Sequence, residues 1–94
     1  MRQPLVAGNW KMHGSRAENA SLVSGLLDLL QPDKRAEILL CPPFPYLMET
    51  GRLLKDSGVA LGAQSVCAES QGAFTGEVSA AMLKDVGCRY VLVG

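Results

Sequence analysis

Short apolar runs alternate with amphipathic stretches along the whole chain. The apolar runs at residues 5–10, 38–41, 59–64 and 90–94 have the length and the flanking turn residues of buried strands. Between them, the spacing of leucine and valine predicts helices over about 15–31, 46–57 and 79–86. An alternation of strand and helix predicts parallel strands joined by helical crossovers, which is an α/β architecture.

The first predicted helix has a clear start and one apolar face. Ser15 stands three residues before Glu18, which is the spacing of a capping box. Pro32 is predicted to end the helix, because proline cannot continue one. The apolar positions at helical spacing are Leu22, Val23, Leu26, Leu27 and Leu30. We expect this stripe to pack against the sheet.

The segment after the first strand decides between the two common α/β frameworks. It contains neither the G-x-G-x-x-G turn of a dinucleotide-binding sheet nor the G-x-x-x-x-G-K-[ST] of a P-loop. Instead, Asn9 and Lys11 interrupt an apolar run at the carboxyl end of the strand. Barrels of eight strands and helices keep their active sites at this end of the strands. The pattern therefore favours a barrel.

Strand periodicity predicts how this polar pair is presented. Side chains alternate between the two faces of a strand, so Asn9 and Lys11 should point the same way. Trp10 should point the opposite way, beneath the helices, where its ring would brace the pair.

Lys11 has no carboxylate partner nearby in sequence, because it is the only charged residue between Arg2 and Arg16. A lysine beside an amide donor suits a phosphate or a developing enolate oxygen, whose charge needs preorganised donors. The alternative is an ordinary exposed lysine that follows a strand.

Composition narrows the possible partners. Nine basic residues balance nine acidic ones, so the chain has no broad positive field for nucleic acid or an anionic membrane. The start of the chain resembles neither a signal peptide nor a membrane span. Cys41, Cys67 and Cys88 lack C-x-x-C spacing and His13 is the only histidine, so we expect no metal site and a reducing, cytoplasmic setting.

Five segments along the chain match one known pattern, in the same order and at the same spacing: Gly8-Asn9-Trp10-Lys11-Met12, Cys41-Pro42-Pro43-Phe44, Leu61-Gly62-Ala63-Gln64, Gly72-Ala73-Phe74-Thr75-Gly76-Glu77-Val78-Ser79 and Tyr90-Val91-Leu92-Val93-Gly94. Together they resemble the triosephosphate isomerase family over essentially all 94 residues. One departure is His13, where many members carry asparagine; we expect it to be a solvent-facing loop residue without a catalytic role.

The resemblance implies an isomerase that interconverts dihydroxyacetone phosphate and glyceraldehyde 3-phosphate through an enediolate, in glycolysis and gluconeogenesis. Lys11 would neutralise the substrate phosphate and the enediolate-like transition state, and Asn9 would hydrogen-bond the substrate near its reacting carbons. No cofactor is implied. Triosephosphate isomerase is itself a familiar example of catalysis by a glutamate base and a neutral histidine. By resemblance, both of these residues would follow Gly94.

The resemblance also implies that residues 1–94 form the first half of the barrel domain. Such a barrel has eight strands and about 250 residues, whereas four strands and three helices are predicted here. The inward faces of the strands, including Leu5, Ala7, Val91 and Val93, would be exposed, as would the two outer sheet edges. We therefore expect residues 1–94 alone to be inactive.

The segment 65–78 has little apolar periodicity and is long for a loop in a compact domain. In the family this loop inserts into a second subunit of a homodimer. By resemblance, Phe74 would fill a pocket of the partner, and Thr75 would approach the partner's copies of Asn9 and Lys11. The alternative is a mobile surface loop, in which an exposed Phe74 would be unusual.

Two other functions remain open at this point. The chain could belong to another phosphosugar enzyme on the same barrel, which the residues following Gly94 would distinguish, since His-Ser-Glu is expected in the isomerase. It could also be a non-enzymatic fragment that serves in assembly or interaction, which a natural stop after Gly94 would indicate.

Overall fold

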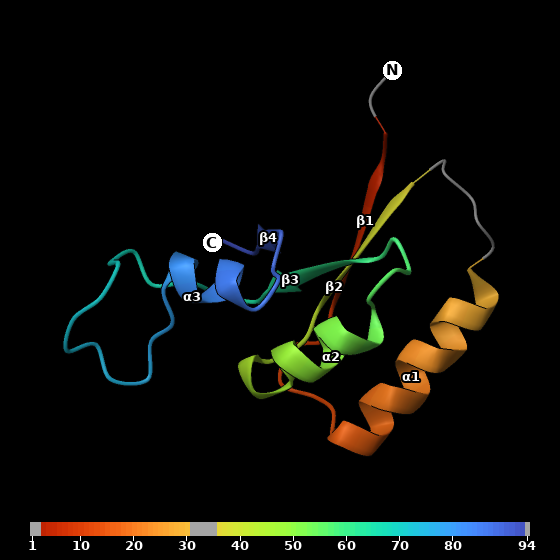
Figure 1. Cartoon of the computed structure of the whole chain (residues 1–94), viewed down its shortest axis with the longest axis horizontal. Coiled ribbons are helices and arrows are strands. Elements are labelled where there is room, and N and C mark those ends of the chain that lie inside the picture. Colours follow the sequence, from red (N-terminus) through yellow and green to blue (C-terminus); the bar gives the residue numbers. More distant parts are fainter. Residues whose placement is uncertain (1–2, 31–35, 94) are drawn as a thin grey trace.

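A computed structural model describes residues 3–30 and 36–93 of the chain. Its parallel strands lie in the order β1-β2-β3-β4 and form a half-barrel, with three α-helices in the connections (Figure 1). The elements are β1 (Leu5–Asn9), α1 (Arg16–Leu29), β2 (Glu37–Cys41), the 3-10 turn η1 (Phe44–Tyr46), α2 (Leu47–Leu53), β3 (Ala60–Ala63), α3 (Ala80–Asp85) and β4 (Tyr90–Val91). The predicted α/β class and the parallel pairing are confirmed.

Helix α1 begins where the capping box was predicted. The Ser15 hydroxyl accepts a hydrogen bond from the Glu18 backbone N–H at 3.2 Å, which satisfies one of the unpaired donors of the first turn. The same hydroxyl donates to the Glu18 carboxylate at 3.1 Å. Helix α1 ends at Leu29; the proposed stop at Pro32 lies outside the described residues.

One face of the sheet is covered by the helices. Val23 of α1, Leu47 of α2 and Leu83 of α3 are buried in a cluster with Leu40 and other strand residues. Leu26 and Leu27 also pack against this cluster, but Leu22 is more than half exposed, so its assignment to the apolar stripe of α1 was wrong. The stripe is narrower because Leu22 lies at the edge of the face of α1 that carries Val23 and Leu26, where it is only partly covered.

The opposite face of the sheet holds a smaller cluster of Leu39, Cys41 and Ala60, against which Tyr90 and Leu92 pack. Gly62 lies within it: a Cβ there would meet the Cys41 sulfur and a Leu39 methyl at 2.8 Å. A glycine is therefore needed in β3 for close approach of these side chains.

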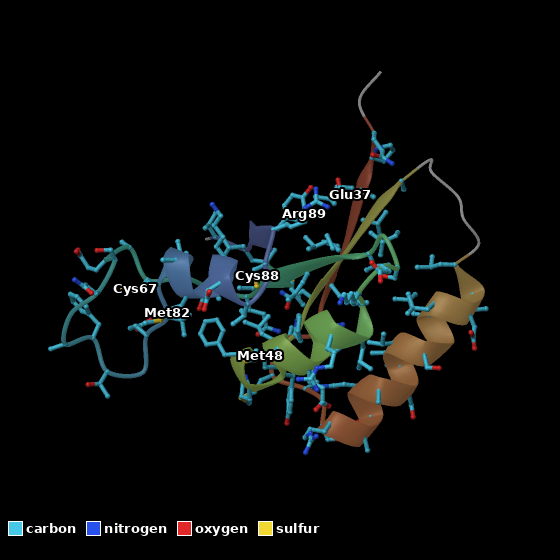
Figure 2. All side chains as sticks on the ribbon, in the orientation of Figure 1. Glu37, Met48, Cys67, Met82, Cys88 and Arg89 are labelled. Atoms are coloured by element: carbon cyan, nitrogen blue, oxygen red, sulfur yellow. The ribbon has the colours of Figure 1, made fainter. Side chains whose placement is uncertain are left out.

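Glu37 ties the two strands beside β3 together. The Tyr90 hydroxyl donates to the Glu37 carboxylate at 2.9 Å, and this bond raises the pKa of the Tyr90 phenol. Figure 2 shows Arg89 beside Glu37, and their charged groups are 3.7 Å apart. This cluster therefore links the start of β4 to the start of β2.

The predicted strand and helix bounds were too long at several ends. Strand β1 stops at Asn9 and β4 at Val91, while α2 ends at Leu53. The expected exposure of the remaining face is confirmed: Leu5 is 47% exposed, and Ala7, Val91 and Val93 are exposed as well. The outer strands β1 and β4 each pair with a single neighbour among the described strands.

Candidate active site

The carboxyl end of β1 presents Asn9 and Lys11 next to each other, but not by strand alternation. The strand ends at Asn9, and Lys11 has a left-handed backbone with φ 55°. The prediction that the two side chains share a strand face is therefore wrong at Lys11. The side-chain oxygen of Asn9 instead accepts a hydrogen bond from the Lys11 backbone N–H at 2.9 Å. This local bond turns the chain out of the strand.

Gln64 fixes the carbonyl end of Lys11. Its side-chain nitrogen Nε2 donates to the Lys11 carbonyl and to the Cys41 carbonyl, both at 2.8 Å. Because Gln64 directly follows β3 and Cys41 ends β2, the ends of three parallel strands meet at this amide. Gln64 was not among the predicted site residues. The signal was present, since Gln64 is a polar residue at the end of an apolar strand, as Asn9 is.

A left-handed non-glycine residue is strained, and Lys11 is such a residue. The cost of this conformation is about 1–3 kcal/mol, and it persists only where surrounding contacts enforce it. Here both the N–H and the C=O of Lys11 are fixed by side-chain amides. The side chain of Lys11 is exposed, and the described ion pairs, Arg16 with Glu49 and Arg89 with Glu37, do not include it. Within residues 3–30 and 36–93, its ammonium group therefore has no ion-pair partner.

Trp10 lies on the helix side of the sheet, as predicted. It is partly buried against the cluster that contains Val23, Leu40 and Leu47, and its backbone N–H donates to the Cys41 carbonyl at 3.1 Å. Trp10 therefore anchors the residue between Asn9 and Lys11 to the core. His13 is exposed, in agreement with a solvent-facing loop position.

The other proposed site residues, Phe74 and Thr75, lie elsewhere. The loop that contains them projects past α3, away from the end of β1 (Figure 1). Phe74 is 49% exposed, and its ring packs back on Gly72, where a Cβ would lie 2.7 Å from the ring. The base of the loop is closed by a hydrogen bond of 2.8 Å from the Cys67 N–H to the Val78 carbonyl. The structure does not bring these two residues to Asn9 and Lys11 of the same chain.

The cysteines offer no activated nucleophile at this site. Cys41, Cys67 and Cys88 are all free thiols. Burial raises the pKa of the Cys41 and Cys88 thiols, which disfavours the reactive thiolate at both positions. Among the described residues, no three His, Cys, Asp or Glu side chains gather as metal ligands would. Within the same residues, no helix has the length and apolarity to span a membrane.

Comparison with known proteins identifies the family. The model of the family "Triosephosphate isomerase" matches residues 4–94. The triosephosphate isomerases of Cupriavidus pinatubonensis and Thiobacillus denitrificans are each 56% identical over 94 residues, which is 100% of this chain and 37% of those proteins. That of Carboxydothermus hydrogenoformans is 48% identical over the same residues, 38% of its length. The chain thus spans little more than a third of these relatives, and it belongs to the triosephosphate isomerase family.

Proposed function

We propose that this chain supplies the amino-terminal, substrate-gripping part of an enzyme that interconverts dihydroxyacetone phosphate and glyceraldehyde 3-phosphate. The observation that supports this most is Lys11 at the end of β1, which has no ion-pair partner in the described part of the chain and is held in a strained conformation by Asn9 and Gln64. Strain of this kind is typical of functional sites. Family membership supports the proposed reaction, and the geometry at the end of β1 supports the role proposed for each residue.

In this proposal Lys11 binds the phosphate of the triose and stabilises the negative charge that develops as a proton leaves carbon. Asn9 uses its oxygen to hold the Lys11 backbone, so its amide nitrogen is the group that donates to a substrate oxygen. A fixed donor and a fixed charge lower the barrier because they need no reorganisation during the reaction. The base and the electrophile would come from residues after Gly94. We propose no cofactor, and we place the enzyme in the cytoplasm, in glycolysis and gluconeogenesis.

Gln64 provides a test that does not alter a charged group. In the full-length enzyme, we expect Gln64→Leu to lower kcat/KM by roughly 10- to 100-fold, about 1.4–2.7 kcal/mol, because the Lys11 carbonyl loses its donor. Steady-state kinetics in both directions would measure this. Thr50→Val is the control, because it likewise replaces a polar side chain by an apolar one, at a buried position of α2 whose hydroxyl has no hydrogen-bond partner among the described residues.

The control should retain wild-type kinetics. Wild-type kinetics in Gln64→Leu would show that the amide does not position Lys11. Absence of triose phosphate isomerisation in the wild-type full-length protein would reject the proposed function itself and favour another phosphosugar substrate.

We also propose that the full-length enzyme is a homodimer in which segment 65–78 inserts beside the partner's Asn9 and Lys11. Two exposed apolar side chains support this: Phe74, and Met12, which adjoins Lys11 and is 92% exposed. A second copy that covers both would remove apolar surface from water.

Replacing residues 69–76 with a short glycine linker should yield monomers of low activity. The change leaves the backbone bond between Cys67 and Val78 in place, so the base of the loop stays closed. Phe74→Ala is the milder variant and should raise the dimer dissociation constant by roughly thirtyfold, about 2 kcal/mol. Sedimentation equilibrium would measure both effects. An unaltered dimer after loop replacement would contradict this interface.

A further inference from the structure

Asn19 is a buried polar side chain that stability alone does not explain. It lies at the end of the first turn of α1 and is 4% exposed, and its side-chain nitrogen Nδ2 has no hydrogen-bond partner among the described residues. A buried amide group without a partner destabilises a fold, and an apolar side chain of similar size avoids that cost. The presence of an asparagine at this position therefore requires another explanation, and its contact with Gly14 supplies one.

That neighbour is Gly14, which ends the segment that begins at Lys11. Gly14 has a φ of +115°, a backbone conformation that side chains disfavour. A Cβ at Gly14 would lie 2.5 Å from the Asn19 side-chain oxygen and 3.4 Å from its Cγ, so the carboxamide lies directly against the Gly14 backbone. The buried amide of Asn19 thus occupies the space that a side chain at residue 14 would need.

The segment from Lys11 to Gly14 is fixed at both ends. Asn9 and Gln64 hold the backbone of Lys11. At the other end, the Tyr46 hydroxyl makes a long hydrogen bond of 3.5 Å to the Gly14 carbonyl, in addition to the Asn19 contact. A shift of Gly14 would be transmitted over only two intervening residues to Lys11.

We infer that Asn19 is a positioning residue for the substrate-binding lysine: its buried carboxamide sets the path of residues 11–14 and, through it, the place of the Lys11 ammonium group. This inference rests on the proposed function for its effect on catalysis. The contact between Asn19 and Gly14 itself stands independently of the reaction.

The test is Asn19→Leu in the full-length enzyme, which keeps the branched outline of the side chain but replaces the planar amide with bulkier methyl groups. We expect the melting temperature to stay the same or rise, because the unpaired amide is gone. The KM for the triose phosphate should rise about three- to tenfold and kcat should fall as well, because a displaced Lys11 both binds the phosphate less well and stabilises the developing negative charge less well. Hydrogen exchange at the amides of residues 12–14 should become faster.

Val23→Ala is the control, since Val23 lies one turn further along the same buried face of α1. Val23→Ala should lower the melting temperature without changing KM. Asn19→Leu should raise KM without lowering the melting temperature. Should Asn19→Leu not fold, Gly14→Ala displaces the same contact from the other side and should raise KM in the same way.

Unchanged KM and unchanged exchange at residues 12–14 in a folded variant would overturn the inference. The exchange measurement does not depend on catalysis. If the wild-type protein lacked isomerase activity but exchange at residues 12–14 still became faster, the proposed function would fail while the positional role of Asn19 would stand.

Discussion

Lys11→Ala in the full-length enzyme is expected to abolish turnover while leaving the fold intact. Lys11 is exposed and forms no ion pair with the described residues, so the fold loses little with its side chain. The reaction loses the charge that binds the phosphate and stabilises the enediolate. Loss of one preorganised donor to a developing anion lowers kcat by about 100- to 1,000-fold, and loss of a full charge at the same place should cost at least as much.

Comparison with Lys11→Gly distinguishes the effect of the lost ammonium group from the effect of the backbone strain. It removes the same ammonium group but also relieves the left-handed strain at φ 55°, so it should be more stable than Lys11→Ala by about 1 kcal/mol and equally inactive. Lys55→Ala is the matched control, because Lys55 is likewise exposed but lies after α2, and it should leave the kinetics unchanged. Steady-state kinetics with circular dichroism would measure all three variants.

Activity of Lys11→Ala within about tenfold of wild type, or about 1.4 kcal/mol of barrier, would remove Lys11 from the chemistry. Equal stability of the alanine and glycine variants would show that the backbone conformation of residue 11 does not lower the free energy of unfolding.

Local pattern predicted the elements of this fold well because each element has a strong local cause. The Ser15 cap starts α1 where it was expected, and the apolar runs became strands in the predicted parallel order. Strand length was less predictable. Tyr90 and Val91 pair with β3, but the equally apolar Leu92 and Val93 lie outside the strand, because β3 ends at Ala63, whose carbonyl accepts a last hydrogen bond from the Leu92 N–H.

The candidate site shows the same division between local and long-range causes. Asn9 and Lys11 could be recognised from their place at the end of an apolar run. The left-handed turn at Lys11 could not, because it depends on Gln64, far away in sequence and brought close only by the sheet. The role proposed for Asn19 was hidden for a similar reason: its contact partner Gly14 lies in the preceding loop, and helical periodicity says nothing about loops.

The sheet itself indicates what residues 1–94 cannot do alone. Leu5 and Val6 are both about half exposed, so both faces of β1 meet solvent, and Val93 is 82% exposed. Open sheet edges with apolar side chains favour association between chains. Residues 1–94 alone would then be marginally stable, and the hydrogen bonds that position Lys11 would form only in the folded fraction.

A purified polypeptide of residues 1–94 is therefore expected to show no isomerase activity, low solubility and weak hydrogen-exchange protection in β1 and β4. Proton transfer from carbon requires a base within hydrogen-bond reach of the substrate, and the described groups that contact Asn9 and Lys11 are amides and backbone carbonyls, which cannot serve as that base. Weak binding of inorganic phosphate at Lys11 is the most that this half should retain. A coupled assay would measure turnover, with a mass spectrum of the same sample to exclude contaminating full-length enzyme. Turnover of about 1 to 1,000 per second, which is ordinary for enzymes, would show that residues after Gly94 are dispensable and would overturn the catalytic assignment.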